Sequence, residues 1–271
     1  MKISYTIETD QILLCDFLKQ LHISKKLLCD IKSQGDLRVN NRHVTVRYLL
    51  QKNDFLEIIF PKEQRGLQLD PYDYPLDIIY EDEYLLVINK PAKISCIPDH
   101  RYHNFTLANA IIHYYQQINL ESTIHFVNRL DRDTQGLLII AKYRYIHYLF
   151  SLTSITRYYY ALVEGNLNDI TINLPIDRVG MNVQRVVSRN GKNAITHCYN
   201  VKNNGDTSLV KCVLETGRTH QIRVHLSAIG HPLVGDRLYH SKTAQNYYLK
   251  SYYLSFTHPI YKRTMTFEIE Q

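Results

Sequence analysis

The sequence predicts an α+β fold in which a small head precedes a larger body built on a mostly antiparallel mixed sheet. Two observations favour this fold. Apolar stretches of strand length outnumber amphipathic helical stretches in the body, and many connections are too short for the crossover between parallel strands. Apolar residues make up 45% of the chain and charged residues 21%, so a sizeable core can form in an ordinary globular protein.

The composition points to a cytoplasmic protein. A formal net charge of +6 over 271 residues is compatible with a polyanionic partner but does not establish one. The five cysteines are far apart and form no CxxC pair, which predicts free thiols in a reducing compartment. We see no secretory signal and no apolar run long enough to span a membrane. We therefore expect no membrane association, and a monomer as the simplest state.

A proline-rich stretch, residues 61–75, divides the chain. It contains three prolines among charged residues and has no periodic apolar pattern. We therefore predict a head over residues 1–62, a linker over residues 63–75 and a body over residues 76–271.

Two helices and a small sheet are expected in the head. Four apolar residues at i, i+3, i+4 and i+7 predict one buried helix face: Leu14, Phe17, Leu18 and Leu21. A second helix should begin after Ser24, a good N-cap, and end at Gly35. Short strands are expected at residues 37–39, from Val44 onward, and over the alternating residues 56–60.

Part of the head resembles the αL-type RNA-binding module. The matching features are a Ser-Lys helix start, a Gly, a Val-Asn turn and an Asp before the closing strand: Ser24, Lys25, Gly35, Val39, Asn40 and Asp54. Lys25, Lys32 and the turn could share a face that meets phosphates. A solvated helix face would show the same charges, so charge alone leaves both interpretations open.

Residues 126–142, FVNRLDRDTQGLLIIAK, form the most informative stretch. A turn with Asp131 and Asp133 precedes an apolar strand, and Arg129 and Arg132 alternate with the two carboxylates. Because neighbouring positive charge favours the ionised form, Asp131 could act as a nucleophile or base at neutral pH. Acidic turns before a strand are also common in solvated loops, so this stretch alone does not decide between a catalytic carboxylate and a solvated loop.

Two further stretches contain candidate binding residues. RYYYALVEG, residues 157–165, predicts a strand whose alternate residues face the core, and Tyr159 is either a core residue or a ring that stacks on a base. In the stretch over residues 215–239, Arg218 lies at a strand-to-helix turn near the positive end of a helix dipole. That position favours a negative partner, either a phosphate or a carboxylate such as Asp131.

The same stretch predicts a helix capped by Thr219 and ended by Gly230. Three histidines occur in it: His220, His225 and His231. The spacing puts the first two on different helix faces and no HExxH motif is present, so we expect no metal site. Hydrogen-bonded structural histidines or phosphate neighbours are expected instead. The remaining stretch, VINKPAK over residues 87–93, predicts only a strand end.

Together the four stretches resemble the RluA/RluD-like family of RNA pseudouridine synthases. That family carries a His-Arg-Leu-Asp-x-x-Thr-Ser-Gly turn, an Asn-Lys-Pro-Ala-Gly strand, a Lys-x-Tyr-x-Ala-x-Val-x-Gly strand and a Thr-Gly-Arg-x-His-Gln-Ile-Arg helix start. Most positions are matched here in the same order, over roughly residues 76–240. The resemblance implies a catalytic domain with a central active-site cleft, and an isomerase that converts specific uridines of structured RNA to pseudouridine.

The resemblance also implies a role for each of four residues. Asp131 matches the catalytic aspartate, and Arg129 matches the arginine that enters the RNA stack and displaces the target base. Tyr159 matches the tyrosine that stacks on the flipped uracil. Arg218 matches the arginine that pairs with the catalytic carboxylate. Four positions depart from the family pattern: Asn128 for His, Gln135 for Ser, Lys93 for Gly and Arg157 for Lys. Asparagine can still form hydrogen bonds, so we expect activity to be retained.

The reaction breaks an N1–C1′ bond, rotates the base and forms a C5–C1′ bond. It involves neither redox change nor phosphoryl transfer, so we expect no cofactor and no metal. Flipping the uridine costs a few kcal/mol, which phosphate contacts and stacking on Tyr159 can offset. Attack by Asp131 on the sugar and elimination to a glycal-like intermediate both remain open. The expected partner is RNA, either large-subunit ribosomal RNA or transfer RNA.

Two other functions compete with this interpretation. In the first, the protein is a non-catalytic RNA-binding protein whose head and basic surface are the whole function. In the second, Asp131 and Asp133 form the carboxylate pair of a glycoside hydrolase, which needs a separation of roughly 5–10 Å. The absence of Trp, a frequent sugar platform, and the surrounding arginines count against the hydrolase.

Overall fold

The computed structural model describes residues 1–63, 69–98, 104–178, 180, 183–243 and 246–270. Contacts divide the chain into two compact units, Met1–Gln68 with Tyr115–Thr123, and Leu69–Tyr114 with Ile124–Gln271. Part of the expected linker, residues 64–68, lies outside the described residues. The division into residues 1–62, 63–75 and 76–271 therefore stays a prediction.

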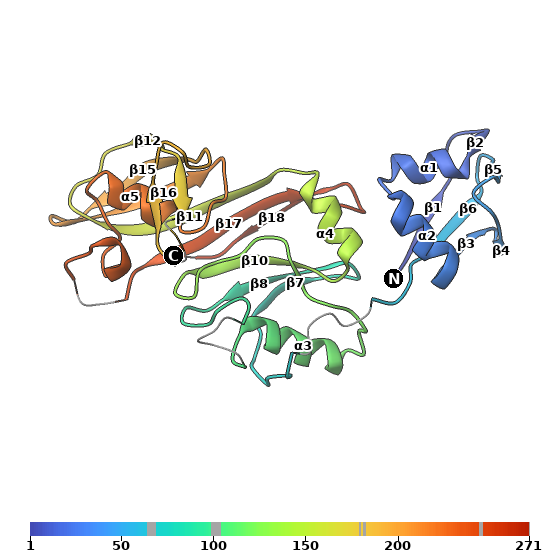
Figure 1. Cartoon of the computed structure of the whole chain (residues 1–271), viewed down its shortest axis with the longest axis horizontal. Coiled ribbons are helices and arrows are strands. Elements are labelled where there is room, and N and C mark those ends of the chain that lie inside the picture. Colours follow the sequence, from blue (N-terminus) through green and yellow to red (C-terminus); the bar gives the residue numbers. More distant parts are fainter. Residues whose placement is uncertain (64–68, 99–103, 179, 181–182, 244–245, 271) are drawn as a thin grey trace. The chain divides into compact units, whose positions relative to one another are not determined.

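The smaller unit combines helices α1 and α2 with a four-stranded sheet ordered β1-β6-β3-β4. Its elements, blue to cyan in Figure 1, are β1 (Lys2–Thr6), β2 (Ile12–Leu13), α1 (Leu14–Gln20), α2 (Lys25–Gln34), β3 (Asp36–Val39), β4 (Arg42–His43), β5 (Leu49–Leu50) and β6 (Phe55–Ile59). The expected start of the second helix is confirmed, because the Oγ atom of Ser24 accepts a hydrogen bond from the backbone N–H of Leu27 at 3.1 Å. Gly35 follows the last helical residue, as expected.

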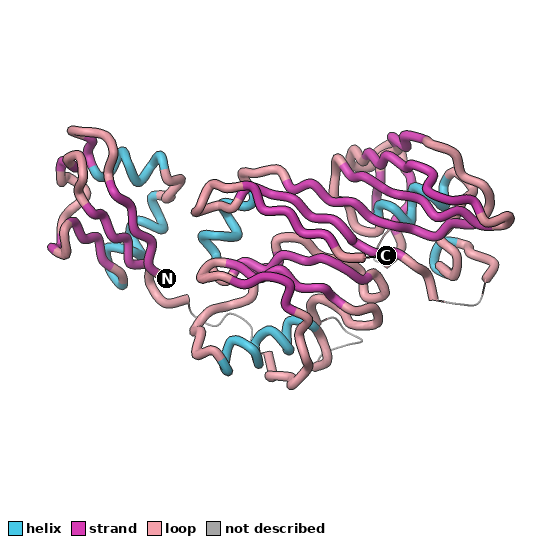
Figure 2. Tube along the Cα trace, turned by 180° about the vertical axis from the view of Figure 1, so that it is seen from behind, coloured by secondary structure: helices cyan, strands magenta, loops and turns pink. Residues whose placement is uncertain are grey.

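The larger unit is dominated by strands, magenta in Figure 2, which confirms the α+β class with a mixed, mostly antiparallel sheet. Its elements are β7 (Ile78–Glu81), β8 (Leu85–Lys90), α3 (Leu107–Gln117, whose last turn belongs to the smaller unit), β9 (His125–Phe126), β10 (Gln135–Ala141), α4 (Arg144–Ser151), β11 (Ile155–Glu164), β12 (Ile170–Asn173), β13 (Ile176–Arg178), β14 (Arg185–Val187), β15 (Ile195–Asn203), β16 (Thr207–Leu214), α5 (Gln221–Ala228), the 3₁₀ helix η1 (Arg237–Tyr239), β17 (Leu249–Thr257) and β18 (Thr264–Glu268). None of the helices in the described part of the chain is long and apolar enough to cross a membrane.

The main sheet has the order β12-β15-β16-β11-β17-β10-β8-β7. At β17 two different strands pair with the same strand edge, and we call this branch point the fork. One edge of β17 pairs in parallel with the start of β10, at Lys250 and Ser251, and then antiparallel with β18 from Tyr253 onward. Every other strand pair in the described sheet is antiparallel. The fork joins the strands around β11 to the strands around β10, which are visible as two groups in Figure 1.

The fork requires a glycine at position 136. Gly136 has a φ of +110°, and a Cβ atom at this position would lie 2.1 Å from the backbone oxygen of Ser251. No side chain fits between the two strands at that distance. Gly136 therefore allows β10 and β17 to approach closely enough to pair.

We expect Gly136→Ala to lower the free energy of unfolding by about 3–5 kcal/mol, because a strained φ and a backbone clash act together. Gly205→Ala is the matched control. Gly205 also has a positive φ, +74°, but its added Cβ would meet no atom within 4 Å, so we expect a loss of about 1 kcal/mol. Urea unfolding of both variants measures the difference, and equal losses would contradict this account of the fork.

Candidate active site

Asp131 lies in the loop between β9 and β10, and three hydrogen bonds fix that loop. The backbone N–H of Thr134 donates to the carbonyl of Asp131 at 3.2 Å and closes a turn. The Sγ atom of Cys96 donates to the carbonyl of Leu130 at 3.2 Å. The Oδ1 atom of Asn128 accepts from the backbone N–H of Ile139 at 2.8 Å. The backbone around Asp131 is thus held from both sides.

Asn128, which stands where the family usually has His, keeps a structural role through that bond to β10. Its side-chain nitrogen is buried and has no hydrogen-bond partner among the described residues. A second departure, Arg157, places its guanidinium against Gly217, where a Cβ atom would lie 3.2 Å from the arginine Nη2. Both departures therefore lie beside loops of the candidate site rather than at its carboxylate.

A buried lysine binds the backbone of the same loop. Lys90 at the end of β8 is fully buried, and its Nζ atom donates to the carbonyls of Pro91, Ile94 and Arg132 at 2.8, 2.9 and 3.1 Å. Burial lowers the pKa of Lys90 to about 8. The Asn-Lys-Pro stretch, which the sequence identified only as a strand end, therefore anchors the backbone directly after Asp131.

The carboxylate of Asp131 is paired with Arg223, which corrects the expectation that Arg218 is its partner. The Nη1 atom of Arg223 lies 2.9 Å from Oδ2 of Asp131. Arg218 instead donates from Nε to the carbonyl of Asn193 at 3.1 Å. The Asp131 side chain is 24% exposed, so it is reachable from solvent.

Arg223 is held in place by a second carboxylate and two aromatic rings. Its Nε and Nη2 atoms donate to Asp236 at 2.7 and 2.9 Å, a bidentate contact between two buried side chains. The guanidinium carbon lies 4.9 Å from the ring centre of Tyr239 and 4.8 Å from that of Tyr247. Although burial alone would lower it, the hydrogen bonds with Asp236 leave the pKa of Arg223 raised.

The turn before α5 differs from its sequence-based description. The helix begins at Gln221 rather than after Thr219, and the capping residue is His220, with φ 58° and ψ 18°. The side chain of Gln221 closes the turn, since its Oε1 atom accepts from the backbone N–H of Arg218 and from the hydroxyl of Thr216. This left-handed turn positions the helix so that Arg223, five residues after Arg218, reaches Asp131.

Tyr159 lies on β11 with Ala161 and Val163, and all three are buried, which confirms the predicted alternation. Burial raises the pKa of the Tyr159 hydroxyl. One hollow is lined by the four residues assigned from the sequence, Arg129, Asp131, Tyr159 and Arg218, together with His220 and Arg223. Residues that are far apart in the sequence are thus brought together at one site.

The histidines are hydrogen-bonded, as expected. His220 contacts the hydroxyl of Tyr239 through Nδ1 at 2.7 Å, and His231 contacts the carbonyl of Glu164 through Nδ1 at 2.8 Å. His225 contacts both the Thr196 hydroxyl and a backbone carbonyl at 2.9 Å. No group of three metal-ligating side chains occurs among the residues that the structure describes.

Sequence reasoning missed three residues of this site: Lys90, Arg223 and Asp236. Each carried a weak signal. Lys90 is a charged residue at the end of an otherwise apolar strand, where an unpaired charge is costly. Arg223 is the last residue of the Thr-Gly-Arg-x-His-Gln-Ile-Arg motif, and Asp236 follows a Gly in the stretch over residues 215–239.

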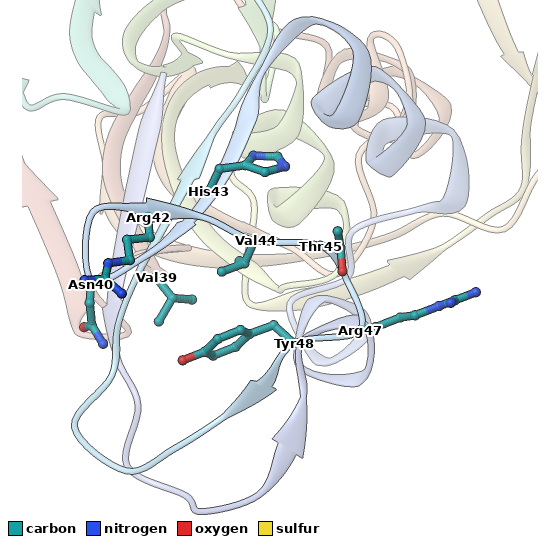
Figure 3. Close-up of a pocket in the computed structure, with 8 residues that line it drawn as sticks. All are labelled: Val39, Asn40, Arg42, His43, Val44, Thr45, Arg47 and Tyr48. Atoms are coloured by element: carbon teal, nitrogen blue, oxygen red, sulfur yellow. The ribbon is translucent and has the colours of Figure 1, made fainter.

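The smaller unit has a separate hollow of about 760 Å³ between the β3–β4 turn and the segment before β5. In Figure 3, Val39, Val44 and the ring of Tyr48 point toward one another, Asn40 and Arg42 lie at one side, and Arg47 extends away. Arg42 and Arg47 are exposed. Neither has a hydrogen bond or ion pair with a described residue, so both guanidiniums are available to an anionic ligand.

Comparisons with known proteins agree with this arrangement. The model of the RNA pseudouridylate synthase family matches residues 84–228, more than half of the chain. A protein of Bacillus subtilis (strain 168) named "uncharacterized RNA pseudouridine synthase YjbO" is 43% identical over 262 residues, which cover 93% of each chain. The "ribosomal large subunit pseudouridine synthase D" of Zymomonas mobilis is 38% identical over 224 residues, covering 74% of this chain and 71% of that protein.

Among solved structures, human RNA pseudouridylate synthase domain containing 1 has a TM-score of 0.59 at 24% identity, over 74% of this chain and 85% of the human chain. That likeness shows a shared fold. The family model goes further than the fold, because its match over residues 84–228 covers the loop of Asp131, the strand of Tyr159 and the helix of Arg223. The chain belongs to the RluA/RluD-like family of RNA pseudouridine synthases and is an isomerase that converts uridine to pseudouridine in RNA.

Proposed function

We propose that Asp131 is the catalytic carboxylate, acting at the ribose of a uridine flipped out of a structured RNA. The observation that carries this proposal is the ion pair between Asp131 and the clamped Arg223, in a hollow that Tyr159 also lines. The ion pair fixes one oxygen of the carboxylate, and both the nucleophilic and the elimination route need a carboxylate held at the ribose.

The three other assigned residues contact the RNA in this proposal. Tyr159 stacks on the flipped uracil. Arg129 is exposed and has no hydrogen bond or ion pair with a described residue, so its guanidinium is available to enter the space that the base leaves. Arg218 is exposed, and its hydrogen bonds to the described residues involve Nε and its backbone N–H. Its Nη atoms are therefore available to a phosphate, and we assign it to RNA binding and not to Asp131.

Large-subunit ribosomal RNA is the first substrate to test, and transfer RNA is the second. Two relatives at 38% and 42% identity are named ribosomal large subunit pseudouridine synthase D. We further propose that the protein acts as a monomer in the cytoplasm, where its five free cysteines would stay reduced.

Residues 1–62 serve as an αL-type RNA-binding head in this proposal. The hollow of the smaller unit combines an aromatic ring and apolar side chains with Arg42 and Arg47, two arginines that have no partner among the described residues. Acidic Asp36 nearby is already bonded to Arg38 and His43 at 2.6 Å each. The arginines therefore contribute a net positive potential toward RNA phosphates.

We expect Asp131→Asn to abolish conversion, because the amide can neither attack the sugar nor take a proton from it. The purified protein is incubated with RNA labelled by 5-³H-uridine, without added metal or cofactor, and released tritium is counted. Asp133→Asn is the control. Among the described residues, the side chain of Asp133 has one long contact, 3.4 Å to Arg132, so this variant should leave release within about twofold of wild type.

Release that is unimpaired in Asp131→Asn would refute the catalytic role of this residue. No release by the wild-type protein from any RNA, with RNA binding intact, would favour the non-catalytic RNA-binding function. The glycoside hydrolase alternative has lost its support, because the family match covers the stretch that contains Asp131 and Asp133.

Replacing Arg223 distinguishes the two candidate partners of Asp131. Arg223→Met should lower the free energy of unfolding by about 3–5 kcal/mol, because it leaves the buried Asp236 unpaired, and should abolish tritium release. Arg218→Met removes an exposed guanidinium and should change stability by less than about 0.5 kcal/mol. Urea unfolding and the release assay measure both effects. A larger loss of stability in the Arg218 variant would contradict the corrected pairing.

The head is tested by salt dependence. The double variant Arg42→Ala/Arg47→Ala should weaken RNA binding and reduce the slope of log K against log salt by about 0.7–0.9 for each phosphate that the arginines no longer neutralise. Lys2→Ala/Lys19→Ala is the control, because it removes the same charge from lysines that are already paired with Glu57 and Asp16. Identical slopes in the two double variants would exclude the hollow as a phosphate-binding surface.

A further inference from the structure

His220 lies at the start of α5 in a backbone conformation that non-glycine residues rarely adopt. Only 9% of its side chain is exposed, although it lines the same hollow as Asp131. Strained residues of this kind cluster at functional sites because the surrounding structure must hold them there. The proposed reaction, as carried by Asp131, Tyr159 and the arginines, does not involve this imidazole.

A chain of hydrogen bonds fixes the tautomer of His220. The backbone N–H of Arg185 donates to the hydroxyl oxygen of Tyr239 at 2.9 Å. That hydroxyl is buried, and the only acceptor near its hydrogen among the described residues is Nδ1 of His220, at 2.7 Å. Nδ1 is therefore an acceptor, and the proton of the neutral ring is on Nε2. Burial lowers the pKa of His220, so the ring is neutral at neutral pH.

The Nε2–H group faces Asp131 across a gap. Nε2 lies 3.8 Å from Oδ2 of Asp131, which is too long for a hydrogen bond. Nε2 has no hydrogen-bond partner among the described residues. Arg223 approaches the same Oδ2 atom at 2.9 Å, while Oδ1 of Asp131 has no partner among those residues. A donor and an acceptor thus stand side by side in the hollow, with one carboxylate oxygen left open.

One hydroxyl group satisfies both atoms. A hydroxyl oxygen about 2.8 Å from each can accept from Nε2–H and donate its own proton to the carboxylate. Within an RNA chain the 3′ and 5′ oxygens are phosphate esters, so the 2′-hydroxyl is the free hydroxyl of each ribose. It is bonded to C2′, next to the C1′ atom at which the reaction occurs.

We propose that His220 and Asp131 together bind the 2′-hydroxyl of the target nucleotide, and that His220 makes the site specific for ribose over deoxyribose. The proposal rests on the proposed role of Asp131 as the carboxylate at the reacting ribose. Oδ2 of Asp131 then accepts the hydrogen bond from the 2′-hydroxyl, and Oδ1 stays available for the reaction at the ribose. Specificity of this kind is large when a buried donor is left unpaired by the analogue that lacks the hydroxyl.

Two substitutions of His220 distinguish the contribution of Nδ1 from that of Nε2. Asn is tolerated in the left-handed region, but its amide reaches only as far as Nδ1, so His220→Asn keeps the turn and removes the donor. The longer Gln places an amide N–H near the position of Nε2. His220→Asn should lower kcat/KM on RNA about tenfold or more, the value of one well-placed hydrogen bond. His220→Gln should recover most of that loss.

The specific readout is discrimination between sugars. The probe is a short RNA hairpin around a uridine that the wild-type protein converts, prepared as its pseudouridine product so that no turnover occurs during binding. A second hairpin differs only by a 2′-deoxy sugar at that nucleotide. The wild type and His220→Gln should bind the ribose form about tenfold more tightly than the deoxy form. His220→Asn should bind the two forms within about twofold.

Tyr239→Phe provides an independent arm, because it removes the hydroxyl that fixes the tautomer and leaves the ring beside Arg223. It should reduce the sugar discrimination, and it should add little to the effect of His220→Asn in a double variant. Undiminished discrimination in both His220→Asn and Tyr239→Phe, with conversion of uridine by the wild type intact, overturns this inference alone. Absence of conversion by the wild type overturns the proposed function with it.

Discussion

The Arg223 guanidinium, held between two carboxylates, is the constraint on which the rest of the site depends. Asp236 is buried and binds Arg223 through two hydrogen bonds, while Asp131 is partly exposed and receives the third. Tyr239 and Tyr247 lie against the guanidinium and limit its contact with water. Because a buried cation needs a fixed anionic partner, Asp236 orients Arg223 before any substrate arrives. Arg223 in turn holds one oxygen of Asp131 and leaves the other available.

The main sheet explains why this pairing can form. The loop between β9 and β10 supplies Asp131, while β11 supplies Tyr159 and α5 supplies Arg223. The two groups of strands meet at β17, where Gly136 permits a backbone approach that no side chain would allow. Lys90 then binds the backbone just after Asp131 with a buried ammonium group. The sheet and the backbone contacts therefore fix the position of the carboxylate, although Asp131 lies in a loop.

The hollows of the two units differ in the chemistry of their linings. The hollow of the larger unit is lined by one carboxylate, one tyrosine ring and three arginines, which suits the proposed reaction at one ribose. The hollow of the smaller unit carries exposed arginines and a tyrosine without a carboxylate on its lining, which suits binding without chemistry. This division of the surface agrees with an isomerase of the RNA pseudouridine synthase family.

Local patterns determined the elements and the family. Ser24 and Gly35 mark the two ends of α2, and the alternation around Tyr159 sets its direction on β11, because each depends on residues close together in sequence. Four ordered motifs likewise identified the family and gathered the candidate residues into one site. The partner of Asp131 was decided only by the tertiary structure. Arg218 and Arg223 lie in one motif, and only the tertiary fold, with its left-handed turn at His220, shows that the second of them reaches the carboxylate. The same holds for Lys90 and Asp236, whose functions arise from contacts with segments distant in the chain.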